Sequence, residues 1–307
     1  MRRRTFVAAA AAGLAAPALT LARSETRSEA EATPMSTPTG TPVVETGYVE
    51  VNGLRMYYES HGEGGVPLVL LHGAFSSIHN SFGTVIEGLA AGRHVIGFDY
   101  QGHGRTADID RPLSIGAIVE DIVAALDDLG VEKADVLGYS TGAAIALQMA
   151  IRFPERVRKL IPMSASYRLD GIHPGLMDGL GEMQPSMMYG SPWHQNYLEL
   201  NPEPDFDALF WKKTAMDKEI KDVPEADIEG LAQPVLIIAG DSDLPTIEHL
   251  ARFFRLVGGG VFGDTPAGLP RSQLAILPGA SHVTAPFRAD LLLAIIPAFL
   301  DREDPPA

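Results

Sequence analysis

The chain contains no cysteine among its 307 residues, and this absence excludes three kinds of functional site. A cysteine nucleophile, a thiolate-ligated metal centre and a disulfide framework all require thiols. Because a chain without thiols folds equally well in oxidising and reducing surroundings, the absence does not indicate a cellular compartment. Any nucleophilic chemistry must come from another type of side chain.

Basic residues are also scarce, since 24 Lys and Arg oppose 39 Asp and Glu and leave a net charge of −15. Binding to nucleic acid or to an anionic membrane requires a basic surface. The sequence also lacks a His-x-x-x-His motif, a Glu/His cluster at metal-ligand spacing and a glycine-rich phosphate loop. We therefore expect no nucleic-acid partner, no metal and no cofactor.

The N-terminus has the pattern of an export signal. Three arginines at positions 2–4 precede an apolar, alanine-rich stretch over residues 6–22, which is too short for a secure membrane span. The stretch resembles a twin-arginine signal. We predict a signal peptide over 1–22, a disordered spacer rich in Ser, Thr, Glu and Pro over 23–46, and a periplasmic or secreted mature protein without stable membrane insertion. An uncleaved leader that anchors the protein is the alternative.

The rest of the chain alternates short apolar runs with amphipathic segments. A hairpin pattern over 48–58 comes first, centred on Asn52-Gly53. The apolar runs are typical of strands buried on both faces of a parallel sheet, and they cover 67–71, 94–98, 134–137, 159–163, 234–239 and 273–277. Helical patterns between and after the later runs cover 115–129, 142–152, 247–257 and 289–300. This alternation predicts an α/β fold with a doubly wound, mostly parallel sheet.

Two segments interrupt the alternation. Residues 167–230 hold no strong strand pattern and are rich in Met, Trp, Tyr and Pro, while residues 258–271 form a Gly/Pro-rich loop. We therefore assign 47–166 and 231–303 to the α/β core and 167–230 to an insertion.

One pentapeptide carries a catalytic pattern in its required context. Gly138-Tyr139-Ser140-Thr141-Gly142 follows a predicted strand and opens a predicted helix, as the Gly-x-Ser-x-Gly nucleophile motif demands. Glycines are needed because the serine sits on a strained, crowded turn. We expect Ser140 to be the nucleophile and the amide of Thr141, at the helix N-terminus, to face a developing oxyanion.

From residue 47 onward the chain resembles the α/β-hydrolase family. The resemblance implies an eight-stranded type of sheet with a helical cap formed by the insertion. His72-Gly73-Ala74-Phe75 looks like the family's oxyanion loop, which would make the amide of Ala74 the second oxyanion donor and place Phe75 in the pocket. The stretch from Asp99 to Arg105 looks like a structural Asp-x-x-Gly-x-Gly turn, so we expect it to act as scaffold.

A serine nucleophile needs an adjacent base, and the chain offers nine histidines. His282 follows the last predicted strand, where members of the family carry their catalytic histidine. The supporting carboxylate follows the strand at 234–239, where Asp241 and Asp243 compete. The resemblance favours Asp243, with Asp241 as a turn residue that binds backbone N–H groups. The separation of Asp243 and His282 is longer than usual for the family, and the loop at 258–271 accounts for it.

These residues predict hydrolysis of a carboxylic ester or lactone through an acyl-enzyme, with no cofactor. We expect a small, moderately apolar substrate, in contact with Phe75, Tyr139, Met187 and Trp193, although the insertion's apolar residues are equally suited to forming its own core. The same triad also serves carbon–carbon bond hydrolases, amidases, acyltransferases and cofactor-free perhydrolases. Dehalogenases and epoxide hydrolases are disfavoured because they carry Asp at the position of Ser140. A non-catalytic ligand receptor is the alternative from another class, and the oligomeric state stays open.

Overall fold

The computed structural model describes residues 44–176, 179 and 182–303. The predicted signal peptide and residues 23–43 of the predicted spacer lie outside these residues. The first strand begins at Val44, three residues before the boundary expected from the sequence. Within the described part of the chain, no helix combines the length and the apolar character needed to cross a bilayer.

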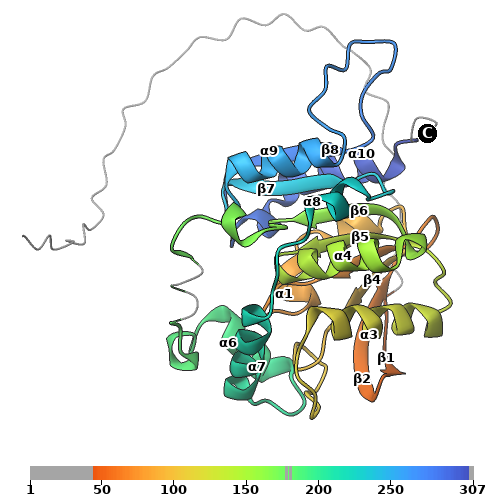
Figure 1. Ribbon diagram of the computed structural model, residues 1–307. Helices are drawn as coiled ribbons and strands as arrows, with labels where there is room; N and C mark the ends of the chain where they lie inside the picture. The colour runs from red at the N-terminus through yellow and green to blue at the C-terminus, as the bar shows by residue number, and fades with distance from the viewer. Residues whose placement is uncertain (1–43, 177–178, 180–181, 304–307) are drawn as a thin grey trace, which may run out of the picture. The chain divides into compact units, whose positions relative to one another are not determined.

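A single eight-stranded sheet organises the fold (Figure 1). Its strands stand in the order β1-β2-β4-β3-β5-β6-β7-β8, and β2 runs antiparallel to both of its neighbours while all other pairs are parallel. The strands are β1 (Val44–Val51), β2 (Leu54–His61), β3 (Leu68–Leu71), β4 (Val95–Phe98), β5 (Ala134–Tyr139), β6 (Val157–Met163), β7 (Leu236–Ser242) and β8 (Gln273–Ser281). The expected doubly wound, mostly parallel sheet is confirmed.

The hairpin of β1 and β2 closes through the two residues that the sequence indicated. Asn52 and Gly53 have φ values of 50° and 80°. Positive φ at both central residues suits the tight turns that match the twist of two antiparallel strands, and Asn and Gly tolerate it best.

Helices cover both faces of the sheet, which is why its strands are apolar on both sides. In β3, Val69 and Leu71 pack into the core on one face, while Leu68 and Leu70 pack into the core on the other. The first face is covered by α3 (Ile115–Asp128), α4 (Thr141–Arg152) and α9 (Ile247–Leu256) (Figure 1). The second is covered by α1 (Ile78–Phe82), α2 (Ile86–Ala90) and α10 (Ala289–Asp301).

The sequence analysis predicted α3, α4, α9 and α10 but neither α1 nor α2. Both missed helices have five residues, which is too short for a helical period to stand out. The side chain of Ser77 caps α1 by accepting a hydrogen bond from the amide of Asn80.

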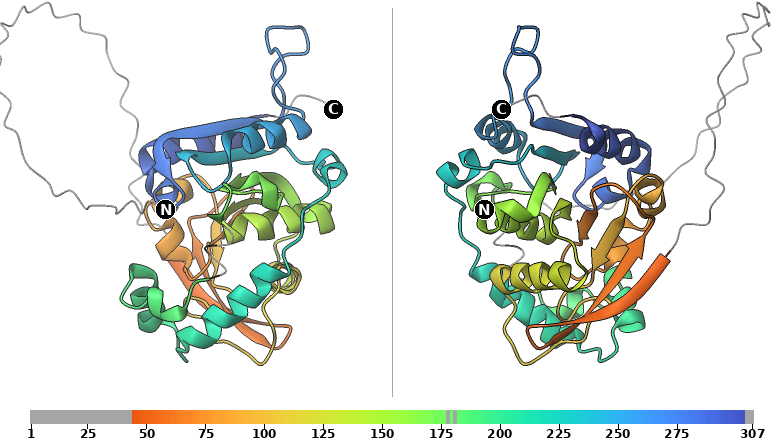
Figure 2. Two further views of the ribbon diagram at one scale, coloured as in Figure 1. Left: turned by 60° about the vertical axis from the view of Figure 1, so that its left-hand side comes forward. Right: turned by 90° about the vertical axis from the view of Figure 1, so that its right-hand side faces the viewer.

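The described residues between β6 and β7 include several helices. They form α6 (Pro192–Leu200), α7 (Phe206–Lys218), α8 (Glu225–Glu229) and the 3-10 turns Leu169–Gly171 and Pro185–Met187. Two further 3-10 turns, Pro154–Arg156 and Ala285–Phe287, lie in the remainder of the chain. Between α9 and β8, residues 258–271 form a loop without helix or strand, which projects from the body of the sheet in both views of Figure 2.

Candidate active site

Ser140 occupies a sharp turn between β5 and α4. Its φ of 55° and ψ of −116° are strained for a residue with a side chain. The flanking glycines are required by crowding, because a Cβ on Gly138 would lie 2.1 Å from the carbonyl oxygen of Gly142, and one on Gly142 would lie 1.9 Å from that of Leu71. The amide of Ser140 donates to the carbonyl of Met163 at 2.9 Å, which ties the turn to β6.

Ser140, His282 and Asp243 form a continuous hydrogen-bonded chain. The Oγ of Ser140 lies 3.0 Å from Nε2 of His282, and Nδ1 of His282 lies 2.8 Å from Oδ1 of Asp243. Each of the three directly follows a parallel strand, β5, β8 and β7 respectively. The carboxyl ends of parallel strands meet at one edge of a sheet, so the topology brings together residues that are far apart in the chain.

Asp243 is buried but fully hydrogen-bonded. Besides His282, Oδ1 accepts the amide of Leu244 at 2.7 Å, while Oδ2 accepts the amide of Gly240 at 3.0 Å and the hydroxyl of Ser164 at 2.6 Å. Burial by itself raises the pKa of Asp243, but the hydrogen bonds, led by those of His282 and Ser164, outweigh it and hold the pKa below its ordinary value. The group is therefore an anion suited to stabilising an imidazolium.

The competing carboxylate, Asp241, points elsewhere. It is exposed, and it accepts a hydrogen bond of 2.8 Å from the amide of Gly279 and one of 3.3 Å from the hydroxyl of Ser242. The first contact joins the end of β7 to β8, and neither contact reaches His282.

Tyr139 supports the loop that carries the histidine. Its hydroxyl donates to the carbonyl of His282 at 2.8 Å, and the two rings lie 5.3 Å apart. Burial raises the pKa of Tyr139, so the hydroxyl keeps its proton and acts as a donor. The contact that the structure provides is with the loop of His282, and the predicted contact of Tyr139 with substrate stays a prediction.

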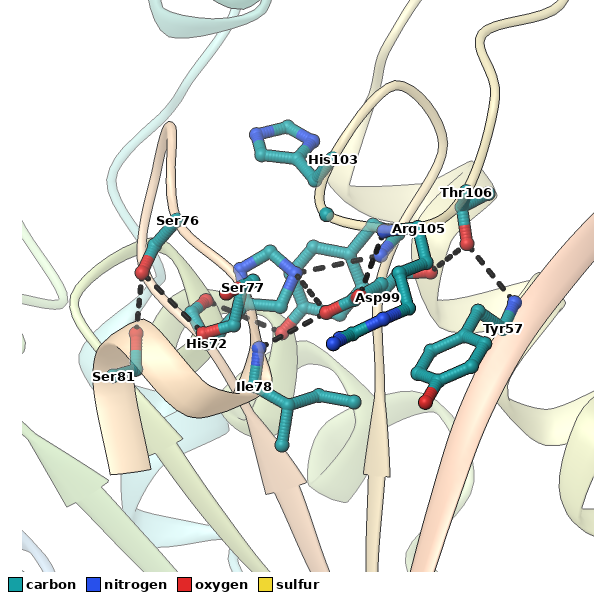
Figure 3. Close-up of polar contacts among 12 residues, drawn as sticks. Tyr57, His72, Ser76, Ser77, Ile78, Ser81, Asp99, His103, Arg105 and Thr106 are labelled. Carbon is teal, nitrogen blue, oxygen red and sulfur yellow. Dashed lines mark hydrogen bonds and ion pairs between the residues drawn. The ribbon is translucent and has the colours of Figure 1, made fainter. Parts of the chain in front are cut away.

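A buried aspartate fixes the loop that follows β3 (Figure 3). One carboxylate oxygen of Asp99 accepts the amide of Ile78 and the other accepts the amide of Arg105, both at 2.9 Å. Gly104 must be glycine because a Cβ there would lie 2.1 Å from the same carboxylate. Asp99 thus joins the turn after β4 to the N-terminus of α1, as the scaffold role expected for this turn requires.

His72, at the start of the same loop, is a neutral structural residue. Burial, and secondarily the nearby His103, hold its pKa well below the ordinary value. Its Nδ1 lies 2.7 Å from the carbonyl of Gly73, and its Nε2 accepts the amide of Tyr100 at 3.4 Å. These partners require the proton on Nδ1.

The two predicted oxyanion donors lie on segments that the network holds in place. Thr141 is the first residue of α4, where backbone amides have no partner within the helix. Ala74 is followed by Phe75, whose φ of 54° marks a sharp change of direction in the loop. In the described part of the chain, neither amide donates a hydrogen bond, so both are available to an oxyanion.

Aromatic residues of the insertion contact the loop after β3. The ring of Phe75 stacks on Phe210 at 5.5 Å and meets Phe206 at 5.8 Å. Of the other residues expected to contact substrate, Trp193 is half-buried at the start of α6, whereas Met187 is 67% exposed. Both roles stay predictions.

The sequence analysis missed three residues of this site: Ser164, Phe206 and Phe210. Ser164 carried one usable signal, because it directly follows the apolar run predicted at 159–163. The two phenylalanines lie in a helix whose apolar residues do not follow one clear stripe, so the sequence could not show which of them faces the core.

Known proteins agree with this architecture. A family model described as the alpha/beta hydrolase fold matches residues 66–214. The chain is 25% identical over 269 residues to the protein named as carbamate hydrolase RutD of Agrobacterium fabrum, covering 79% of this chain and 99% of that protein. It is 30% identical over 272 residues to the dihydrolipoyllysine-residue acetyltransferase component of the acetoin cleaving system of Pseudomonas putida, covering 82% of this chain and 68% of that protein.

Among solved structures, the 2-hydroxy-6-oxo-6-phenylhexa-2,4-dienoate hydrolase of Rhodococcus sp. strain RHA1 has the same fold. It superposes with a TM-score of 0.69 at 19% identity, over 85% of this chain and all of that one. The sheet, the helices on its two faces and these relatives together lead to one conclusion. The chain is a hydrolase that belongs to the α/β hydrolase fold family.

Proposed function

We propose that this protein hydrolyses an ester-type bond, in a carboxylic ester or a lactone, of a small and moderately apolar substrate. The observation that carries the proposal is the hydrogen-bonded chain from Ser140 through His282 to Asp243, with distances of 3.0 and 2.8 Å. This is the geometry in which a serine hydroxyl is activated by an imidazole that a carboxylate orients.

In the proposed reaction, Oγ of Ser140 attacks the acyl carbon and passes its proton to Nε2 of His282. The carbonyl oxygen becomes an oxyanion, which the amides of Ala74 and Thr141 stabilise. His282 then gives the proton to the leaving alcohol as the carbon–oxygen bond breaks. Water, activated by the same imidazole, hydrolyses the acyl-enzyme and restores Ser140. No metal or cofactor takes part in these steps.

The chemistry of the insertion supports an apolar acyl group. Phe75, next to the predicted oxyanion donor, packs against Phe206 and Phe210 of α7. In addition, the hydroxyl of Ser77 donates to the side-chain oxygen of Asn196 in α6 at 3.0 Å, which links α6 to the loop after β3. We propose that residues 167–230 form the cap of the active site and that its phenylalanines favour apolar substrates.

The test is the mass of the intact protein after incubation with a fluorophosphonate. Wild type is expected to gain one adduct, and Ser140→Ala is expected to gain none while keeping the thermal unfolding temperature of wild type. Absence of an adduct on folded wild type would refute the serine mechanism and favour a non-catalytic ligand receptor.

A panel of substrates then separates the reactions that share this triad. We expect turnover of p-nitrophenyl esters and simple lactones. A carbamate and a dienoate with a cleavable carbon–carbon bond are included for comparison, because the names of two relatives point to these substrates. If a carbamate, an amide, a peracid-forming mixture or a dienoate is turned over faster than the esters and lactones, the proposed triad still stands but the ester assignment is wrong.

We also propose that residues 1–22 direct export, on the strength of the arginines at positions 2–4 and the apolar stretch after them. N-terminal sequencing of protein recovered from a periplasmic fraction tests this. A mature N-terminus near residue 23 is expected, whereas an intact leader on membrane-bound protein would indicate an anchor.

A further inference from the structure

Glu59, His61 and His79 form a cluster outside the proposed catalytic site. Glu59 and His61 are two residues apart on β2, so their side chains leave the same face of the strand. His79 lies in α1, which covers that face. The sequence analysis found no metal-binding spacing, because His79 comes 18 positions after His61.

The donor atoms of these residues converge on one point. Nε2 of His61 lies 3.1 Å and Nε2 of His79 lies 2.8 Å from the same oxygen, Oε2 of Glu59. All three atoms lie within 4.8 Å of one another. Around a tetrahedral zinc ion with bonds of about 2.0–2.1 Å, neighbouring donor atoms stand about 3.3 Å apart. Small side-chain rotations therefore convert this triangle into three ligands of one ion.

The second carboxylate oxygen of Glu59 is held separately. Oε1 accepts the hydroxyl of Tyr57 at 3.0 Å and the guanidinium of Arg105 at 3.3 Å. A metal at Oε2 would leave both contacts intact. Such outer hydrogen bonds orient ligands in natural metal sites, and their loss typically weakens metal affinity about 10–100-fold.

Exposure and charge also suit a cation. Glu59 is 2% exposed and His61 is 6% exposed, which limits their motion, whereas the side chain of His79 is 49% exposed and opens the cluster to solvent. The buried carboxylates of Glu59 and Asp99 bring two negative charges against the one positive charge of Arg105. Two imidazoles with one carboxylate are a donor set that favours zinc over magnesium or calcium.

We propose that Glu59, His61 and His79 bind one divalent transition-metal ion, with Zn²⁺ as the best fit. The ion would join β2 to α1, immediately after the loop that carries the predicted oxyanion donor Ala74. Its role is to hold that part of the fold, since the triad needs no metal. The proposal does not depend on the reaction that the triad catalyses.

The experiment is a calorimetric titration of the full chain, produced without a histidine tag and freed of metal with EDTA. Titration with Zn²⁺ in excess Mg²⁺ is expected to show one saturable site of micromolar affinity or tighter. The Mg²⁺ suppresses general cation binding by an acidic protein. The visible spectrum of the Co²⁺ form provides a second readout, which reports nitrogen and oxygen coordination directly.

His79→Gln is the decisive variant, because its half-exposed position makes unfolding a small risk. It should bind Zn²⁺ at least about tenfold more weakly than wild type, and Zn²⁺ should raise its unfolding temperature less. His173→Gln, at an exposed histidine outside the cluster, is the matched control and should bind as wild type does. No saturable binding by wild type, or equal binding by wild type and His79→Gln, would overturn the proposal.

Discussion

Ser164 donates a hydrogen bond of 2.6 Å to Oδ2 of Asp243, the carboxylate oxygen that His282 does not contact. The backbone of Ser164 has a left-handed conformation here, with a φ of 58°, which is strained for a residue with a side chain. The bond fixes the rotation of the carboxylate and so the direction in which Oδ1 faces the imidazole. Ser164 is therefore a positioning residue for the proposed triad.

Ser164→Ala should lower kcat/KM about tenfold, because a hydrogen bond to a charged group contributes about 1.5–3 kcal/mol. KM should change little, since the hydroxyl donates to Asp243 and its role is to orient that carboxylate. Steady-state kinetics on a p-nitrophenyl ester provide the measurement. Ser242→Ala is the matched control, because this exposed serine donates to Asp241 instead. Equal losses in both variants would contradict the positioning role.

Replacing the two competing aspartates should separate them clearly. Asp243→Asn is expected to reduce kcat roughly 10³-fold or more, because an amide in place of the carboxylate favours the wrong histidine tautomer. Asp241→Asn should keep kcat near the wild-type value, because this carboxylate accepts hydrogen bonds from Gly279 and Ser242 and makes none with His282. A larger loss in Asp241→Asn than in Asp243→Asn would reverse the assignment of the acid.

Burial raises the pKa of Asp99 to about 6, despite the amide hydrogen bonds that lower it. The unfolded chain releases this proton near pH 3.9. Between these values the folded chain binds the proton and the unfolded chain does not, so this group makes the free energy of unfolding fall as pH rises from about 4 to about 6. Above that range its contribution is constant.

Urea denaturation at several pH values tests this contribution. Asp99→Asn removes the titrating group, so the difference in unfolding free energy between wild type and the variant should change across pH 4–6 and level off above it. A difference that stays constant over that range would show that the carboxyl group of Asp99 has an ordinary pKa.

Substitutions at two glycines with positive φ allow the cost of backbone strain to be distinguished from the cost of steric crowding. Gly53 has a φ of 80° and open space around its missing Cβ, whereas Gly104 has a φ of 49° and Asp99 at 2.1 Å. Gly53→Ala should cost about 1–2 kcal/mol of unfolding free energy from strain alone. Gly104→Ala should cost clearly more, because it also displaces the carboxylate that holds α1. Equal costs in urea denaturation would contradict that role of Asp99.

The cap aromatics should set the preference for acyl length. Phe210 is 2% exposed and stacks on Phe75, whereas its neighbour Trp211 is 47% exposed. Phe210→Leu should lower kcat/KM about tenfold for a hexanoate ester, as the loss of apolar contact predicts, and less for an acetate ester. Trp211→Leu should leave the ratio of the two esters near that of wild type. An unchanged ratio in Phe210→Leu would remove this residue from substrate selection.

Local patterns in the sequence determined most of the fold. The apolar runs marked the strands because strands buried on both faces must be apolar throughout. The amphipathic segments marked four of the helices, and Gly138-x-Ser140-x-Gly142 stood out because its crowded turn excludes side chains. Helices α1 and α2 were not predicted, because five residues are too few to show a helical period.

Which side chains meet is decided by the strand order, because it joins residues from distant parts of the chain. The six parallel strands are each followed directly by a residue of the described networks: His72, Asp99, Ser140, Ser164, Asp243 and His282. The strand ends before His72, Asp99 and Ser164 matched the predicted runs, whereas the strands before Ser140, Asp243 and His282 extend beyond the runs that the sequence indicated. The structure was needed to show that His282 contacts Asp243 and not Asp241. It was also needed to show that Glu59 and His61 converge with His79, because these contacts arise only when the elements pack.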